Sequence, residues 1–267
     1  MTDLFIIGLG ISSISQISKE SEHAIESSNE VLYLDTGVAT KSYLEQHCPR
    51  VTSLYESNYN EGHRRLSAYH MMAAQVITAA IERPPVSFAI HGHPLVAVTA
   101  PFTVLRLART LGLQVQVQPG VSAMDSLFAD LEIDPVINGM QMYEATDLLL
   151  RRRPLQTDVP ALIWQIGSLE SVLHTQRRSR PERFTRFSHY LSQFYSQEQI
   201  MTAIYSAPHP AMDATKISCQ LSELSQYADQ FHAGFTLFIP AARQRPIHDL
   251  DLLSKLDDRD HLERLTR

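Results

Sequence analysis

The sequence is poor in cysteine, and this scarcity limits the kind of protein that it can encode. Its 267 residues include only Cys48 and Cys219. These two thiols lack the CxxC spacing of a zinc site and are too few for a disulfide framework. Because unpaired thiols fit a reducing compartment, we expect a cytoplasmic protein without structural disulfides.

Long apolar runs are also missing. No stretch approaches the ~20 apolar residues of a membrane span. The N-terminal segment MTDLFIIGLG has no basic region, and its apolar run is too short for a signal peptide. These absences predict a soluble protein with no membrane partner.

Positive charge is scarce as well. Lysine and arginine number 23 against 29 acidic residues, which gives a formal net charge of -6. No global basic field is therefore available to attract nucleic acid. The dense basic run at 151–154 and the looser group at 177–186 are either solvated loops or a docking site for an acidic partner.

What the sequence does contain is a regular alternation of apolar runs and helical patterns. Hydrophobic residues make up 44% of the chain, which is ample for a buried core. Strands are expected at 4–8, 31–34, 86–90, 114–117, 139–144, 161–166, 199–205 and 234–239. Helices are expected at 15–27, 62–82, 101–111 and 122–131. The alternation of strands and helices up to residue 117 predicts βα units and a largely parallel sheet, and the later strands indicate a second α/β unit, so the fold class is α/β.

Domain boundaries follow from the turn residues. Pro119-Gly120 divides the chain into an N-terminal α/β unit, residues 1–118, and a C-terminal α/β unit, residues 119–242. Residues 243–267 form a charged tail, in which Leu250, Leu253 and Leu256 indicate a weakly amphipathic helix.

The segment GLGISS, Gly8 to Ser13, begins like a dinucleotide fingerprint. Ser13 stands where the third glycine is needed, and no acidic residue follows at the expected offset. We interpret the glycines as the means by which the chain turns tightly out of its first strand, in preference to an NAD site.

The segment HGHP, His91 to Pro94, follows the expected strand at 86–90. Gly92 permits close approach of a ligand, and Pro94 fixes the loop. Loops at the carboxyl ends of strands are where open α/β sheets bind ligands, although a plain tight turn is the alternative. Two histidines also suggest a metal, but no carboxylate or cysteine follows at ligand spacing, so we expect none.

The segment PGVSA, residues 119–123, joins a strand to a helix. Ser122 is a suitable N-cap, and capping alone explains its presence. The functional alternative is that this loop packs against a cofactor. It is not a nucleophile elbow, because G-x-S-x-G is absent.

Three tyrosines surround one arginine: Tyr55, Tyr59, Arg65 and Tyr69. Arg65 and Tyr69 are four residues apart on the expected helix, so they share a face. A nearby guanidinium favours phenolate and lowers a tyrosine pKa, which would suit proton chemistry. Core packing with polar tips turned to water is the alternative.

Taken together, these motifs resemble the tetrapyrrole methylase superfamily over roughly residues 1–240. The resemblance rests on the GLG turn, the glycine–proline loop, PGVSA and the closing GFTLFIP strand. It implies two α/β/α units with S-adenosylmethionine in the cleft between them. Tetrapyrrole enzymes usually carry G-x-G-P-G and a GDP loop, whereas this chain has GLGIS and GHP.

Within that superfamily the chain is most similar to the borosin peptide backbone α-N-methyltransferases. Shared segments are GHP, PGVSA-x-D, YEATD, the QIG turn and the tyrosine–arginine group. The resemblance implies that Tyr55, Tyr59, Arg65 and Tyr69 are catalytic. It implies that the cofactor is bound by Gly92, His93, Pro94, Val96, Ser122, Ala123, Gln165, Gly234 and Thr236.

The resemblance also implies a substrate. Borosin enzymes methylate backbone amides of a ribosomal precursor peptide with a leader and a core, and they form interlocked homodimers. Because residues 243–267 are charged and unlike an apolar core, we expect the precursor on a separate chain, giving a heterotetramer. The alternatives are methylation of a small molecule such as a tetrapyrrole, and a regulator that binds S-adenosylmethionine without turnover.

Overall fold

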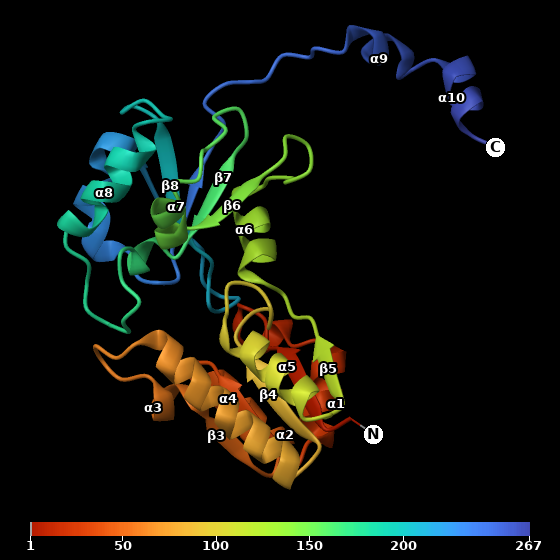
Figure 1. The fold of residues 1–267 in the computed structure, drawn as a ribbon, viewed down its shortest axis with the longest axis vertical. Coiled ribbons are helices and arrows are strands. Elements are labelled where there is room, and N and C mark those ends of the chain that lie inside the picture. The colour runs from red at the N-terminus through yellow and green to blue at the C-terminus, as the bar shows by residue number, and fades with distance from the viewer. Residues whose placement is uncertain (1) are drawn as a thin grey trace.

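The computed structural model describes residues 2–267 and shows two α/β units followed by an extended tail (Figure 1). The N-terminal unit contains five strands: β1 (Leu4–Gly8), β2 (Glu30–Leu34), β3 (Val51–Ser53), β4 (Val86–Ile90) and β5 (Val115–Gln118). They form one parallel sheet in the order β3-β2-β4-β1-β5. The predicted α/β class is confirmed.

Helices cover both faces of this first sheet. They are η1 (Ser13–Gln16), α1 (Lys19–Ser27), α2 (Val38–His47), α3 (Leu54–Asn58), α4 (Arg65–Glu82) and α5 (Ala100–Thr110). Met72 of α4 and Val104 of α5 share a buried cluster with Phe88 of β4. On the other face, Ile25 of α1 and Leu44 of α2 belong to a second cluster. Burial on both faces explains why the inner strands β1, β2 and β4 are mostly apolar.

The second unit has a mixed sheet. Its strands are β6 (Gln141–Glu144), β7 (Ala161–Trp164), β8 (Ile200–Tyr205), β9 (Thr215–Gln220) and β10 (Thr236–Ile239), in the order β6-β7-β10-β8-β9. Only the β6–β7 pair is parallel. The parallel arrangement expected for the first unit therefore does not extend to this unit. A hairpin joins β8 directly to β9, and β10 enters antiparallel between β7 and β8, so these pairs need no helical crossover.

The helices of the second unit are α6 (Ala123–Leu131), α7 (Ala145–Arg151), η2 (Ile166–Ser168), α8 (Glu182–Leu191) and η3 (Leu221–Gln230). The predicted boundary at Pro119-Gly120 falls in the turn between β5 and α6, and it stays a prediction. The basic group predicted as a loop at 177–186 runs into α8. None of the helices within residues 2–267 is both long and apolar enough to cross a membrane.

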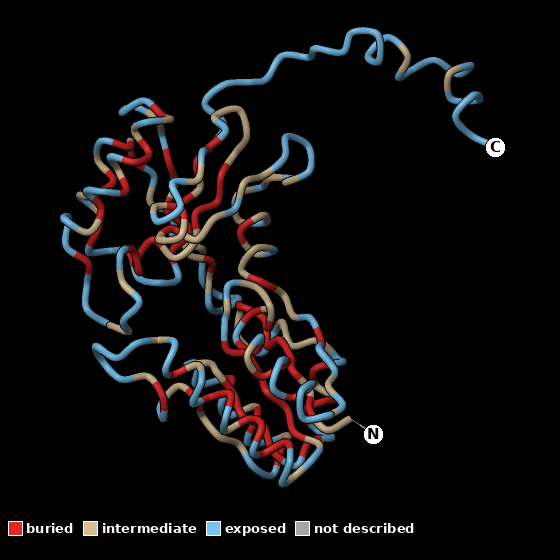
Figure 2. Tube along the Cα trace, in the orientation of Figure 1, coloured by how far each residue is buried: buried red, intermediate tan, exposed pale blue. Residues whose placement is uncertain are grey.

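The tail carries two short helices, α9 (Leu250–Lys255) and α10 (Arg259–Leu265), where one was expected. Asp258 explains the break, because its carboxylate accepts from the Asp260 and His261 amides and so caps a new helix. Nearly every tail residue is exposed (Figure 2).

Three glycines meet where β1, β4 and β5 end. A Cβ on Gly8 would lie 2.6 Å from both Gly120 Cα and the Gly92 carbonyl oxygen, and a Cβ on Gly120 would lie 2.7 Å from Gly8 Cα. Backbone atoms cannot swing aside as a flexible side chain can. The close approach therefore requires glycine, and it fixes the GLG, GHP and PGVSA loops against one another.

One loop of the second unit joins the first. This bridging loop, residues 171–177, runs antiparallel to residues 61–65. The Gly62 amide donates to the His174 carbonyl at 2.8 Å, and the His174 amide donates back to His63 at 2.8 Å. Glu61 accepts from the Thr175 hydroxyl at 2.6 Å and from the Gln176 amide at 3.1 Å. The loop is thus held on the N-terminal unit by main-chain and carboxylate hydrogen bonds.

We predict that Gly120→Ala reduces the free energy of unfolding by about 3 kcal/mol, the upper end of the range for overpacking. The added Cβ would meet backbone atoms of Gly8 and Gly92, which cannot move aside. Gly112→Ala is the control. Gly112 has a φ of +75° and open space around it. Gly112→Ala should therefore reduce the free energy of unfolding by only about 1 kcal/mol, the strain of an alanine in the left-handed conformation. Urea unfolding measures both, and equal losses would contradict the steric argument.

We predict that Glu61→Ala makes the Gln176 amide exchange hydrogen several-fold faster, because the amide loses its acceptor. The exposed Glu45→Ala should leave that amide unchanged. Hydrogen bonds from Thr175 and Gln176 lower the Glu61 pKa. The stabilisation of the loop by the Glu61 carboxylate is therefore fully present above the ordinary glutamate pKa, and it is lost as the pH falls through the lowered pKa of Glu61. Unchanged exchange in the variant would show that the carboxylate does not hold the loop.

Candidate functional site

A small cavity of about 220 Å³ lies between the two units. Seven of the nine residues predicted to hold a cofactor line it: Gly92, His93, Val96, Ala123, Gln165, Gly234 and Thr236. They come from the loop after β4, the start of α6, the turn after β7 and the start of β10. Segments far apart in the sequence therefore converge on one space.

Pro94 and Ser122, the other two, are buried but are not among the residues that line the cavity. Ser122 accepts from the Asp125 amide, and the Asp125 carboxylate accepts from the Ser122 amide at 2.7 Å. This reciprocal capping box starts α6. The Ser122 side chain is thus engaged in capping, the simpler of its two expected roles.

The GLGISS turn offers little room for a pyrophosphate. Gln16 Oε1 accepts from the Ile11 amide at 2.7 Å and from the Ser12 amide at 2.9 Å. A dinucleotide site would need such amides to face the ligand. The Gln16 side chain instead occupies these amides, which agrees with the interpretation of this segment as a tight turn.

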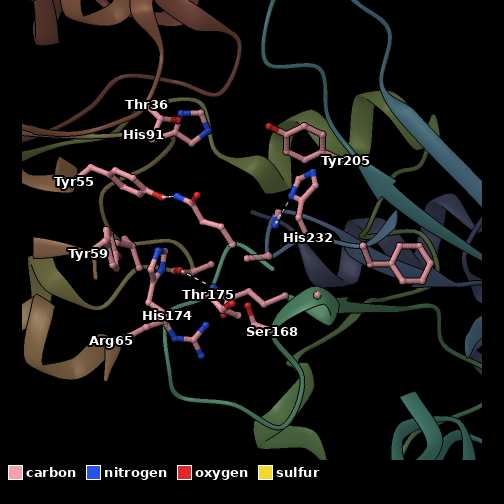
Figure 3. A pocket seen from close by; sticks show the side chains of 18 of the residues that line it. Thr36, Tyr55, Tyr59, Arg65, His91, Ser168, His174, Thr175, Tyr205 and His232 are labelled. Carbon is pink, nitrogen blue, oxygen red and sulfur yellow. Dashed lines mark hydrogen bonds between the residues drawn. The ribbon is translucent and has the colours of Figure 1, made fainter. Parts of the chain in front are cut away.

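A larger hollow of about 920 Å³ adjoins the small cavity (Figure 3). Tyr55, Tyr59, Arg65 and Tyr69 all line it, so the structure brings the predicted catalytic group together. His91, Ala97, Val98, Gln165, Tyr205, Ala233 and Gly234 line both spaces. The two spaces are therefore contiguous, and the tyrosines lie in the same opening as the cofactor candidates.

The aromatic rings of this group contact one another. The Tyr59 ring centroid lies 4.9 Å from that of Tyr55 and 6.4 Å, edge on, from that of Tyr69. His174 of the bridging loop stacks on Tyr59 at 4.7 Å. Gln176 of the same loop donates to the Tyr55 hydroxyl at 3.2 Å. The bridging loop thus completes the site from the second unit.

The electrostatics of Tyr59 differ from the expectation. Burial raises its pKa, the neighbouring Tyr69 and Tyr55 hydroxyls raise it further, and Arg65 opposes them as the smallest influence. The expected lowering by the guanidinium is therefore wrong for Tyr59, because desolvation penalises the phenolate more than the arginine stabilises it. Tyr59 is a neutral phenol that can donate a hydrogen bond.

Arg65 is anchored to the main chain. Its Nη2 donates to the Ser171 carbonyl at 2.8 Å, and its amide donates to Val172 at 3.0 Å. The guanidinium therefore ties α4 to the bridging loop while its charge stays in the hollow. The Arg65 side chain therefore stabilises the position of the bridging loop in addition to placing a positive charge in the hollow.

Several residues of the hollow were not predicted from the sequence. His174, Gln176, Tyr205, His232 and Asp35 all line it. His91 stood in a predicted motif but was not assigned a role. The signal for Asp35 was present, because it follows the expected strand at 31–34, which neighbours β4. His174 and Gln176 carried no signal, because only the fold brings their loop across to α4.

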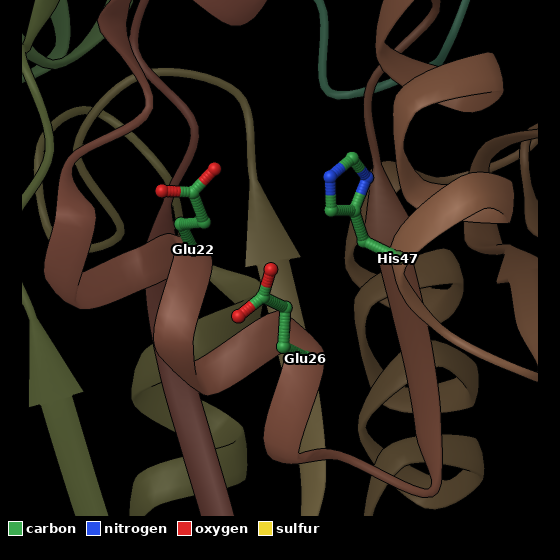
Figure 4. Close-up of side chains that lie close together, drawn as sticks. All are labelled: Glu22, Glu26 and His47. Carbon is green, nitrogen blue, oxygen red and sulfur yellow. The ribbon is translucent and has the colours of Figure 1, made fainter.

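One group of possible metal ligands lies outside the hollow. Glu22, Glu26 and His47 have ligand atoms within 4.8 Å of one another on α1 and α2 (Figure 4). Glu22 already accepts from the Tyr43 hydroxyl at 2.8 Å, and the Tyr43 ring stacks on His47. This group is a hydrogen-bonded contact between two helices, remote from the predicted site residues.

Comparison with known proteins gives consistent results. The family model for tetrapyrrole (corrin/porphyrin) methylases matches residues 3–188. The methyltransferase/ribosomally synthesized cyclic peptide gymnopeptides precursor of Gymnopus fusipes is 30% identical over 95% of this chain and 60% of its own length. The corresponding omphalotin A precursor of Omphalotus olearius is 28% identical over 95% and 61%. The chain thus spans about three fifths of these relatives.

Solved structures share the fold at low identity. Uroporphyrin-III C-methyltransferase from Thermus thermophilus, complexed with S-adenosylhomocysteine, superposes with a TM-score of 0.61 at 14% identity, covering 88% of this chain and 96% of that one. Diphthine synthase gives 0.60 at 16% identity, covering 98% and 100%. These proteins thus share the overall fold of this chain. The match of the family model over residues 3–188 shows that this chain belongs to the tetrapyrrole (corrin/porphyrin) methylase family.

Proposed function

We propose that this protein is an S-adenosylmethionine-dependent methyltransferase that methylates backbone amide nitrogens of a ribosomal precursor peptide. One observation carries the proposal: the phenol–guanidinium group and the cofactor candidates line contiguous spaces. Relatives whose names join a methyltransferase to a cyclic peptide precursor support the choice of substrate.

The residues of the small cavity fit this cofactor. A Cβ on Gly234 would lie 2.8 Å from the Tyr205 ring, so only glycine leaves that part of the cavity open. Gln165 is held in the left-handed conformation and donates to the Ala97 carbonyl at 3.4 Å, across the two units. Gly92, His93, Gln165 and Gly234 would hold the cofactor mainly by shape and main-chain groups. When bound, it supplies a methyl group activated by a sulfonium charge.

An amide nitrogen needs help to accept a methyl group. Its lone pair is delocalised into the carbonyl, so the nitrogen becomes nucleophilic only as its proton leaves and charge moves to oxygen. The neutral Tyr59 phenol is suited to donate to that oxygen, and Tyr69 lies beside it. Preorganised donors of this kind are worth roughly 3–4 kcal/mol in other enzymes. The Arg65 charge adds to the same stabilisation.

The larger hollow has enough volume to hold a short segment of a peptide chain. Its volume of about 920 Å³ is at the upper end of the ~300–1,000 Å³ range of small-molecule pockets. We propose that the precursor, with its leader and core, is a separate chain. We also propose a homodimer that binds two peptides.

Mass spectrometry after incubation with S-adenosylmethionine and candidate precursor peptides tests this function. Mass steps of about 14 Da, the mass that one methyl substitution adds, are expected, and fragmentation should place them on backbone nitrogens. Methylation of side chains only, or of a tetrapyrrole in place of any peptide, would overturn the proposal.

We predict that Tyr69→Phe lowers kcat by roughly 10²–10³-fold, the usual cost of losing one hydrogen-bond donor to a developing oxyanion. The ring and its packing remain, so S-adenosylhomocysteine affinity should be unchanged by calorimetry. Tyr227→Phe, in η3 and outside both cavities, is the matched control and should retain full turnover. If Tyr69→Phe turns over at the wild-type rate with saturating peptide, the tyrosine group serves packing alone.

We predict that Ala123→Leu weakens S-adenosylhomocysteine binding by at least roughly tenfold. The three added carbons would occupy part of the small cavity and reduce the binding free energy by about 1.4 kcal/mol or more. Ala129→Leu changes the exposed face of the same helix and should bind normally. Calorimetry measures both affinities, and thermal unfolding checks that the variants fold. Normal binding by Ala123→Leu would place the cofactor elsewhere.

A further inference from the structure

His91 and Asp35 stand side by side at the edge of the hollow. Asp35 follows β2 and His91 follows β4, and these parallel strands are neighbours, with Leu34 opposite Ile90. The His91 amide continues the ladder by donating to the Leu34 carbonyl at 3.1 Å. Sheet register, and not a flexible loop, therefore sets the distance between the two side chains.

The Asp35 carboxylate is fixed and nearly buried. Its Oδ1 accepts from the Gly37 amide at 2.6 Å, and its Oδ2 accepts from His91 Nδ1 at 3.1 Å. Its side chain is 9% exposed, against 44% for His91. Burial raises the Asp35 pKa, but His91 and the backbone amides outweigh it and the net pKa is lowered. In a neutral imidazole, a carboxylate acceptor at Nδ1 holds the proton on Nδ1, so that Nε2 carries the free lone pair.

This arrangement distinguishes His91 from two other histidines of the site. His93 Nδ1 accepts from the Leu95 amide at 3.1 Å, and His232 Nδ1 accepts from the Gly234 amide at 3.1 Å. A neutral imidazole that accepts at Nδ1 carries its proton on Nε2 and cannot accept there. Of these three, only His91 offers a basic Nε2.

The position of His91 is also suitable for proton transfer from a bound substrate. It lines both the small cavity and the larger hollow, so it stands where a methyl donor and a peptide nitrogen would meet. Tyr205 lines the same junction, and Asp35 contributes to the raised Tyr205 pKa, after burial. The neutral Tyr59 provides a hydrogen-bond donor but no proton acceptor, so the proposed reaction still needs a base.

We propose that His91, oriented by Asp35, is the catalytic base that removes the amide proton; this inference rests on the proposed function. The N–H bond breaks and its proton moves to Nε2 of His91. The amide nitrogen keeps that electron pair and forms the new bond to the methyl carbon. The carbon–sulfur bond breaks, its electron pair stays on sulfur, and the imidazolium later releases its proton to water.

Variants of the two residues test the proposal on the full chain. His91→Gly should lower kcat by roughly 10²–10⁴-fold, while the peptide KM and S-adenosylhomocysteine affinity stay within about twofold. Added imidazole should restore part of the kcat of His91→Gly. His209→Gly, an exposed histidine outside both cavities, is the control and should be active with no response to imidazole. Asp35→Asn should lower kcat without changing KM.

Nitrogen-15 NMR of the histidine rings gives a readout that does not depend on turnover. His91 Nε2 should be unprotonated in the wild type and become protonated in Asp35→Asn, because an amide can donate to Nδ1. A protonated Nε2 in the wild type would overturn the proposal. So would near-wild-type turnover of His91→Gly, or a loss that imidazole does not restore.

The two proposals fail in different ways. If the wild type methylates no peptide, the proposed function fails, and the NMR result alone decides whether His91 is poised as a base. If the wild type methylates peptides and His91→Gly does so equally fast, the function stands and the base lies elsewhere.

Discussion

Everything about the site depends on the contact of three glycines where β1, β4 and β5 end. Gly8, Gly92 and Gly120 allow backbone to touch backbone, with no room for a Cβ at Gly8 or Gly120. That contact brings the loop after β4 against the start of α6, and it thereby forms one side of the small cavity. The motifs GLG, GHP and PGVSA act together, because each supplies one of the three glycines of this contact.

A second constraint is the bridging loop, which makes the tyrosine group a shared property of both units. Main-chain hydrogen bonds place His174 over Tyr59, and Arg65 is held by the Ser171 carbonyl. The resulting desolvation makes Tyr59 a neutral donor and not a base. Burial, more than the nearby positive charge, sets the pKa of this phenol, and for this reason we propose His91, with its carboxylate partner Asp35, as the base.

Much of the first unit could be predicted from the sequence, because its strands are buried on both faces and read as apolar runs. β3 has only three residues, and β9 is an edge strand in which half of the residues are exposed, so neither shows a clear pattern. The candidates in the HGHP and PGVSA loops were suggested by glycine and proline residues after strands, whereas Gln165, Gly234 and Thr236 came only from the family resemblance. The contributions of His174 and Gln176 could not be predicted from the sequence, because they depend on contacts between segments that are distant in sequence.

The account claims that methyl donor and peptide meet at the junction of the two spaces, beside His91, Tyr59 and Tyr69. A crystal structure with S-adenosylhomocysteine and a substrate peptide tests this claim most directly. We expect the thioether sulfur in the small cavity, a peptide carbonyl oxygen within hydrogen-bonding distance of a tyrosine hydroxyl, and that peptide's nitrogen facing the sulfur. A peptide bound away from the larger hollow, or a cofactor product outside the small cavity, would contradict the account.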